Sequence, residues 1–484
     1  MIGTEVKGIP VLISLLFLFC DCAHAQPDED LQLILQPQNT AQTIDGFGAS
    51  GAWWAQIVGG WTGPERTRIV KLLFGKVGIG LSIYRYNIGA GSKDDIRDPW
   101  RGAETFEVGP GQYDWSRDAS AVRVVKEACA QGVKHVILFA NSPPKRMTKS
   151  GYAYGREKAG RSNLREEMYD AYATYMVDVA GHFIDAEGIP VRGISPINEP
   201  NWAWDGSSQE GCHYEPEEAA RLVEILLRKI EKRSLNVEVD TLEVGSWERV
   251  EELGGTDWHK SPVYVDTIFR NPYILRNLGS YAVHSYWAER KHKKAFAQYF
   301  MKTYPGKKLH MTEWCEMKSG RDFGMDSALT LANEIVDDFV EGGVSSWQYW
   351  VAVSRYNFRD GLIYVDEEPR AIHPTKRLWA MGNFSRFIRP GFQRFAVVSG
   401  SPVLRALACK DRDSGVLVVV VVNNAEKRQT AKLRLPGARG QRRLHSFETS
   451  GKNDLKQICS NAVQGSYTFP PRSITTLVFE RNRK

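Results

Sequence analysis

Two glutamates of the chain each stand at the end of a short apolar segment. Glu199 lies in ISPINEPNWAW, where Pro200 stops a run of β-strand character. Glu313 lies in KLHMTEW and is followed at once by Trp314. One such glutamate could simply cap a turn, but the repeated context indicates a pair. Two carboxyl groups on either side of one bond are what cleavage of a glycosidic linkage requires.

Aromatic and amide side chains accompany both acids. A pyranose ring presents an apolar C–H face that flat indoles cover, while amides and carboxylates bind its hydroxyl groups. A single tryptophan more often packs in a core, but many of the 14 tryptophans of this chain fall at the predicted strand ends. We therefore expect a sugar site that includes Trp53, Trp54, Asn87, Asn198, Trp202, Trp204, Tyr286, Trp287, Trp314 and Trp350.

Three basic side chains belong to the same candidate site. Arg85 lies in an apolar segment, LSIYRYNIG, where an unpaired guanidinium would be costly. We expect it to pair with Glu199 and Glu313. His284 alone would more often be a core histidine, but its aromatic neighbours favour a site role. Arg355 follows the last apolar segment, where it could bind a substrate carboxylate through two hydrogen bonds.

Strand and helix patterns alternate along most of the chain. The expected strands are residues 44–48, 81–88, 135–141, 191–197, 241–244, 281–286, 308–312 and 344–350. The expected helices are residues 64–73, 119–130, 165–184, 216–232, 263–278, 293–303, 327–341 and 375–388. Eight strands, each followed by a helix, predict a (β/α)8 TIM barrel over residues 45–388. The candidate residues fall at the carboxyl ends of its strands, where barrel enzymes place their active sites.

Short apolar segments at hairpin spacing follow residue 391 and predict a small antiparallel β-sandwich. Residues 31–44 alternate in polarity and have no other partner, so we expect them to join this sandwich. The second domain would then consist of residues 28–44 plus 389–484.

The first 25 residues have the pattern of a secretory signal peptide. An apolar stretch at residues 9–19 precedes Ala23-His24-Ala25, and it is too short to span a bilayer. We expect a secreted or cell-surface protein without a transmembrane segment, with a lipid anchor at Cys20 as the alternative. The other cysteines form no C-x-x-C pair, although Cys409 and Cys459 could form a disulfide.

The formal charge of +6 is unevenly distributed. Residues 386–484 carry 19 Lys and Arg against 6 Asp and Glu, a net charge of +13, which leaves −7 for the rest. The basic residues are scattered over short strands, which favours a solvated sheet face over adhesion to an anionic polysaccharide and does not fit nucleic-acid binding. The G-x-G-x-x-G run at residues 46–51 leads into two tryptophans, so we expect no nucleotide cofactor.

These motifs together resemble glycoside hydrolase family 30, which belongs to the barrel glycosidases with the acid on strand four and the nucleophile on strand seven. The resemblance rests on GFGASGAWWA, YRYNIGAG, FANSPP, INEP with W-x-W and QEGC, TEW, and RLWAMGNFSRFIRPG. The WW pair, YRYNIG and INEP–QEGC look most like the endo-β-1,6-galactanase branch. Lys145-Arg146 after FANSPP, and Cys315-Glu316-Met317 after the second acid, depart from the family pattern.

The resemblance implies a retaining double displacement without metal or cofactor. Glu199 would be the acid/base and Glu313 the nucleophile, kept ionised with a low pKa by Arg85 and His284 while the pKa of Glu199 rises. Asn198 would bind the 2-hydroxyl, and His284 or Tyr286 would hold Glu313. We expect a secreted, monomeric endo-β-glycosidase that acts on a polysaccharide, β-1,6-galactan first. The alternatives are a glucuronoxylan endo-xylanase, a β-1,6-glucanase, and a non-catalytic carbohydrate-binding protein.

Overall fold

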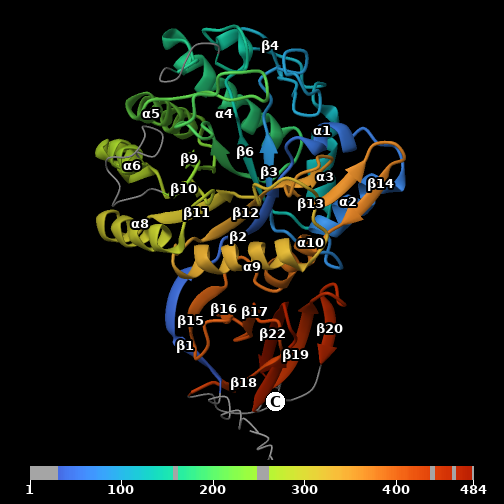
Figure 1. Ribbon diagram of the computed structural model, residues 1–484. Helices are drawn as coiled ribbons and strands as arrows, with labels where there is room; N and C mark the ends of the chain where they lie inside the picture. The colour runs from blue at the N-terminus through green and yellow to red at the C-terminus, as the bar shows by residue number, and fades with distance from the viewer. Residues whose placement is uncertain (1–30, 156–161, 248–260, 437–441, 460–464, 482–484) are drawn as a thin grey trace, which may run out of the picture.

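The computed structural model describes residues 31–155, 162–247, 261–436, 442–459 and 465–481. The expected signal peptide therefore lies outside the described residues. The chain forms an α/β body built around a parallel sheet, and a second, mixed sheet lies below it in Figure 1, with α9 between the two. Within the described ranges, no helix is both long and apolar enough to cross a membrane.

The parallel sheet has the strand order β8-β7-β6-β3-β2-β12-β11-β10-β9. Only two residues, Asp240 and Thr241, separate β8 from β9 in the chain, and these strands pair with β7 and β10 respectively. The carboxyl ends of all these strands therefore lie at one edge of the sheet. The strands are β2 (Gly46–Ser50), β3 (Ile83–Asn87), β6 (His135–Phe139), β7 (Val191–Ser195), β8 (Glu238–Val239), β9 (Leu242–Val244), β10 (Ser280–His284), β11 (Lys308–Glu313) and β12 (Ser346–Ser354).

The central strands are buried on both faces, which is why they read as continuous apolar segments in the sequence. Helices cover the outside of this sheet (Figure 1). They are α1 (Trp54–Val58), α2 (Pro64–Phe74), α3 (Ala119–Ala130), α4 (Tyr169–Asp185), α5 (Pro216–Arg233), α6 (Ser261–Arg270), α7 (Pro272–Asn277), α8 (Arg290–Thr303), α9 (Met325–Val340) and α10 (Lys376–Ser385). The single helix expected at residues 263–278 is wrong, because Asn271 caps a new helix that begins at Pro272.

Two small hairpins were absent from the sequence-based expectation. One pairs β4 (Glu107–Gly109) with β5 (Gln112–Tyr113), and the other pairs β13 (Gly361–Asp366) with β14 (Ala371–Pro374). β13 also pairs in parallel with the last residues of β12, so this hairpin is attached to the parallel sheet at the carboxyl end of β12.

The second sheet has nine strands in the order β20-β19-β22-β17-β16-β15-β1-β18-β21. As expected, β1 joins it, antiparallel to β15 and parallel to β18, so the sheet is mixed rather than purely antiparallel. Its strands are β1 (Gln32–Thr43), β15 (Gln393–Ser399), β16 (Leu404–Lys410), β17 (Leu417–Asn423), β18 (Gln429–Arg434), β19 (Arg442–Thr449), β20 (Lys456–Cys459), β21 (Ser466–Phe469) and β22 (Ser473–Arg481).

The disulfide considered between Cys409 and Cys459 is wrong. Cys409 is a free, buried cysteine of β16, and three strands lie between β16 and β20. The two bodies share one hydrophobic core, which includes Phe384 of α10 and Val420 of β17, and α9 and α10 add polar contacts with the second sheet. Arg405 pairs with Asp337, and Asn383 donates to Thr476 Oγ1 at 2.9 Å.

Candidate active site

The two predicted acids lie together at the carboxyl edge of the parallel sheet. Glu199 follows β7, Glu313 ends β11, and the two residues are only 7% and 4% exposed. One oxygen of each carboxyl group and one ring nitrogen of His284 all lie within 4.8 Å of one another. Carboxyl groups roughly 5–5.5 Å apart characterise retaining glycosidases, whereas inverting enzymes keep them farther apart.

Arg85 of β3 is fully buried and its guanidinium connects several site residues. Its Nη1 donates to Glu313 Oε2 at 2.7 Å, while Nη2 donates to Asn198 Oδ1 at 2.9 Å and to Glu243 Oε2 at 2.7 Å. The expected pairing with Glu313 is present. The expected pairing with Glu199 is wrong, because Glu243 takes the second carboxylate position around the guanidinium.

Glu243, a fully buried residue of β9, was not among the residues predicted from the sequence. The sequence did contain a signal for it. A glutamate in the apolar segment TLEV, like Arg85 in its own apolar segment, would be costly to bury without a partner. Two charged residues in two different strands of one buried sheet predict each other as partners.

His284 and Tyr286 contact different acids. His284 Nδ1 lies 3.0 Å from Glu199 Oε1 and 3.8 Å from Glu313 Oε1, whereas Tyr286 Oη donates to Glu313 Oε1 at 3.1 Å. Burial and the nearby charge of Arg85 lower the pKa of His284 well below its usual value. His284 is therefore a neutral partner of Glu199, and the expectation that it holds Glu313 ionised is wrong.

Burial raises the pKa of both acids. For Glu199 the charge of Glu313 adds to the effect of burial, and its pKa lies well above that of an exposed glutamate. For Glu313, burial also raises the pKa, but the charge and hydrogen bond of Arg85 oppose that rise. The expected order of the two pKa values stands, but the expected low pKa of Glu313 does not, because burial outweighs its ion pair.

Four residues of this region adopt backbone angles that are unusual for side chains of their size. Of the eight described non-glycine residues with positive φ, four are Glu199, Trp204, Glu243 and Trp287, with φ between 46° and 56°. Such angles cost about 1–3 kcal/mol each and persist where the surrounding structure fixes them, commonly at functional sites.

The aromatic residues fall on two sides of the acids. Trp53 and Trp350 pack edge to face at 5.1 Å, and the Arg85 guanidinium lies 5.7 Å from the Trp350 ring. Trp202 and Trp287 pack edge to face at 6.1 Å, and the Trp202 backbone N–H donates to the Glu199 carbonyl.

The first pair thus lies on the Arg85 and Glu313 side, and the second pair lies on the Glu199 side. Trp204 also adjoins Glu199, because its indole N–H donates to the Glu199 carbonyl at 2.9 Å.

Two of the expected aromatic residues pack within the protein. Trp54 is fully buried, and its indole N–H donates to the Ser50 carbonyl at 2.9 Å. Trp314 is 6% exposed and packs against Trp347 and Tyr349. The expectation for Trp54 is wrong, because its ring is fully buried. Trp314 is no more buried than Trp53, and its contact with a sugar stays a prediction.

Arg355 is paired with two carboxylates of the protein. Its Nη1 donates to Glu367 Oε1 and its Nη2 to Asp98 Oδ1, each at 2.6 Å. These two carboxylates already neutralise the charge that a substrate carboxylate would seek.

The departures from the family pattern have structural partners. Lys145 pairs with Asp95 at 2.9 Å, and Arg146 binds Glu107 through two hydrogen bonds of 3.1 and 2.7 Å. These pairs connect the segment after β6 to the segment that follows β3.

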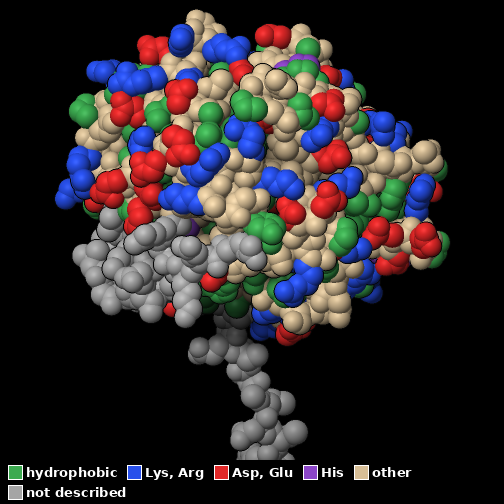
Figure 2. Space-filling view, turned by 90° about the horizontal axis from the view of Figure 1, so that it is seen from above, with side chains coloured by type: hydrophobic (Ala, Val, Ile, Leu, Met, Phe, Trp, Pro, Cys, Tyr) green, Lys and Arg blue, Asp and Glu red, His purple; other side chains and the backbone are tan. Residues whose placement is uncertain are grey.

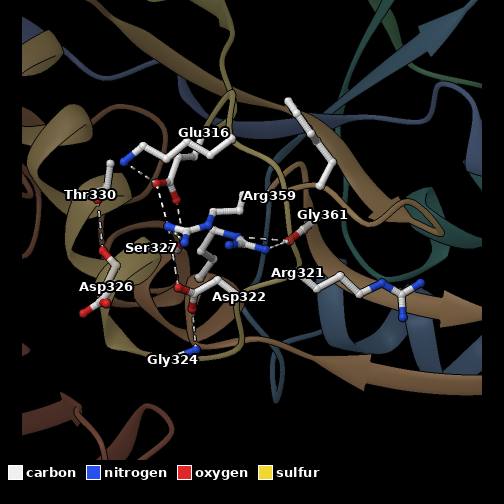
Figure 3. Close-up of polar contacts among 12 residues, drawn as sticks. Glu316, Arg321, Asp322, Gly324, Asp326, Ser327, Thr330, Arg359 and Gly361 are labelled. Atoms are coloured by element: carbon white, nitrogen blue, oxygen red, sulfur yellow. Dashed lines mark hydrogen bonds and ion pairs between the residues drawn. The ribbon is translucent and has the colours of Figure 1, made fainter.

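The segment after Glu313 is anchored by Glu316. Figure 3 shows its carboxylate facing Ser327 at the start of α9 and Arg359 before β13. The Arg359 contact is 3.0 Å, and Lys318 adds a third at 3.1 Å. This network fixes the loop that follows the candidate nucleophile.

Glu199, His284 and Glu313 are also the described residues whose donor atoms are close enough to share a cation. The Arg85 guanidinium already binds Glu313 and places a positive charge beside this trio. The arrangement of donors therefore suits proton transfer between the acids and a bound sugar.

An α/β body that presents two buried, closely spaced carboxyl groups at its strand ends is the arrangement of a glycoside hydrolase. The sequence profile of O-Glycosyl hydrolase family 30 matches residues 30–364, and the chain belongs to that family.

Similar proteins include an endo-beta-1,6-galactanase from Hypocrea rufa, 24% identical over 84% of this chain and 83% of that protein. Glucuronoxylanase XynC from Bacillus subtilis is 25% identical over 73% of this chain and 77% of that protein. The crystal structure of a conserved exported protein from Bacteroides fragilis superposes with a TM-score of 0.83 at 26% identity, covering 92% of this chain and 100% of that one.

Proposed function

We propose that the protein is a secreted, retaining endo-β-glycosidase that hydrolyses β-1,6-galactan, with Glu313 as nucleophile and Glu199 as acid/base. The observation that carries this proposal is the closeness of the two carboxyl groups combined with their unequal surroundings. Glu313 accepts from Arg85 and Tyr286, whereas Glu199 faces the neutral ring of His284. Burial raises the pKa of both acids, but Glu313 is the more readily ionised of the two and Glu199 the more readily protonated.

In the first step Glu313 attacks the anomeric carbon while Glu199 gives its proton to the departing glycosidic oxygen. A glycosyl ester forms on Glu313, so the negative charge next to Glu199 disappears and the pKa of Glu199 falls. In the second step Glu199 takes a proton from water, which attacks the ester and releases the sugar. Two inversions at the anomeric carbon give net retention of configuration.

Asn198 supports the reacting sugar. Its Oδ1 accepts from Arg85 Nη2, which orients the amide and leaves its NH2 group as the donor for a substrate hydroxyl. A hydrogen bond to the 2-hydroxyl strengthens as the oxocarbenium-like transition state forms.

Unsatisfied buried donors suggest where the glycone binds. Trp53 Nε1 and Asn87 Nδ2 are buried and have no hydrogen-bond partner among the described residues. Buried polar atoms rarely stay unpaired, so sugar hydroxyls are their natural partners. We assign Trp53, Asn87 and Trp350 to the glycone side, and Trp202, Trp204 and Trp287 to the leaving-group side next to the acid.

We also infer that the parallel sheet closes into a (β/α)8 barrel and that the nine-stranded sheet folds as a sandwich domain. β8 and β9 stand at the two ends of the strand order but follow each other closely in the chain, which supports closure. Similarity to an exported protein, together with the apolar stretch at residues 9–19, supports secretion.

The choice of β-1,6-galactan over glucuronoxylan rests on similarity and on Arg355. Its two ion pairs with Asp98 and Glu367 disfavour a role in binding glucuronate. The test is a product profile on β-1,6-galactan, β-1,6-glucan and glucuronoxylan side by side, with Glu313→Gln as the inactive control. Oligosaccharides from galactan alone support the assignment. Stronger cleavage of glucuronoxylan or glucan reassigns the substrate, and equal sugar release by Glu313→Gln ends the enzymatic mechanism.

A further inference from the structure

Glu243 contacts both halves of the catalytic pair, although it cannot reach a substrate. Its side chain is fully buried and binds Arg85 Nη2, the same guanidinium that binds Glu313. Its backbone carbonyl accepts the N–H of Glu199 at 2.9 Å. One residue therefore supports the acid through the backbone and the nucleophile through the side chain.

The backbone of Glu243 is held in an unusual conformation, with φ of 56°. The backbone of Glu199, at the other end of the hydrogen bond, also has a positive φ of 46°. Two neighbouring glutamates held this way indicate a local arrangement that the surrounding structure imposes at some energetic cost.

The orientation of Arg85 depends on Glu243. Arg85 Nη2 donates to both Glu243 and Asn198, and Nη1 donates to Glu313. Without the Glu243 carboxylate, Nη2 would keep only the neutral amide of Asn198. The planar guanidinium could then turn as a unit, which would change both the Glu313 contact and the Asn198 orientation.

We propose that Glu243 is a positioning residue that fixes the Arg85 guanidinium and, through its negative charge, sets the pH range in which Glu199 and Glu313 work as a pair. This inference rests on the proposed function. The titratable and charged groups around Glu243 come from five elements: Arg85 of β3, Glu199 after β7, Asp240 before β9, His284 of β10 and Glu313 of β11.

The sign of the effect follows from like charges. The negative charge of Glu243 disfavours ionisation of both catalytic acids and so raises the pKa of each. Removing that charge lowers both pKa values, and Arg85 then binds Glu313 as its one remaining carboxylate. The bell-shaped pH profile of kcat/KM moves to lower pH, and the more tightly held Glu313 becomes a weaker nucleophile.

The experiment compares Glu243→Gln with Glu243→Asp on a soluble aryl glycoside of β-1,6-galactobiose. Gln keeps an acceptor for Arg85 but removes the charge, whereas Asp keeps the charge but shortens the side chain. Asp240→Asn is the matched control, because Asp240 is also buried beside β9 but binds His310 at 2.8 Å. Thermal melting of every variant reports its folding.

We expect both limbs of the Glu243→Gln profile to shift down by about one pH unit, with kcat/KM reduced about 10²-fold. Glu243→Asp loses kcat but keeps the wild-type pH range, and Asp240→Asn loses thermal stability without shifting the profile. A folded Glu243→Gln variant with the wild-type pH range overturns the proposal. Failure of the proposed function is distinguishable, because then Glu313→Gln remains active or the wild type does not cleave the substrate.

Discussion

Gly245, directly after β9, is the position where one added methyl group tests the placement of the acid. A Cβ atom there would lie 2.8 Å from Trp202 Nε1 and 3.1 Å from Glu199 Oε1. Its backbone φ is not positive, so alanine is compatible with the chain conformation. Gly245→Ala therefore perturbs the packing against Glu199 rather than the fold.

The size of the effect follows from these distances. Ordinary contacts begin near 3.4 Å, so the Trp202 ring must retreat by about 0.6 Å and the Glu199 carboxyl group by about 0.3 Å. A misplacement of 1 Å can cost about 10²-fold in rate. Scaled to these displacements, the loss in kcat is about 4- to 16-fold on the polysaccharide.

The assay uses aryl glycosides of β-1,6-galactobiose whose phenols differ in pKa. Proton donation by Glu199 matters most for poor leaving groups, so the loss should be largest on these and on the polysaccharide, and near zero for nitrophenols. Gly279→Ala is the control, because this exposed glycine before β10 has nothing within 4 Å of an added Cβ. An equal loss for all leaving groups, or no loss at all, would refute the placement of Glu199 as the acid.

Three further predictions concern Glu199, Arg355 and His310. Glu199→Gln should abolish the basic limb of the pH profile, and azide should restore turnover with a β-configured glycosyl azide; full activity on polysaccharide would contradict its role. Arg355→Ala should leave any trace activity on glucuronoxylan unchanged, whereas a loss of about 10²-fold would show that Arg355 binds glucuronate. His310 lies between Asp45 and Asp240, and these carboxylates raise its pKa, against the opposing effect of burial, to about 10. Its stabilisation is complete below the unfolded pKa of about 6.5 and lost as pH rises through 10, so His310→Gln should cost about 3 kcal/mol at pH 6 and much less at pH 10.5 in chemical unfolding; a difference independent of pH would contradict this.

Much of the fold could be predicted because the strands of the parallel sheet are short apolar segments that end in polar residues. The segment HVILF of β6 reads as a buried strand without any knowledge of its neighbours. The hairpin of β13 and β14 was missed because the strand–helix alternation left no place for an additional pair of strands. Its segment GLIYVD is nevertheless strand-like.

The site was predictable at the level of residue types but not of pairings. The sequence cannot show which of two adjacent tryptophans points inward. Trp54 is bonded to the Ser50 carbonyl, whereas the Trp53 ring packs against Trp350. Whether His284 faces Glu199 or Glu313 depends on register. A register irregularity between Val283 and His284 sets His284 beside Glu313 in the ladder while its ring contacts Glu199.

The face of the molecule seen from above carries charges of both signs. Seen from above, Lys and Arg side chains alternate with Asp and Glu over the face in Figure 2. A mixed surface of this kind fits a neutral polysaccharide substrate better than a highly charged one.

The most direct test of the double displacement is the configuration of the first product. Proton NMR can follow the anomeric signals during hydrolysis of β-1,6-galactan by a high concentration of enzyme, before mutarotation. For a retaining enzyme, we expect the β anomer of the reducing end to appear first and the α anomer to grow in later. An α anomer as the first product would mean a single inversion, and Glu313 would then not be the nucleophile.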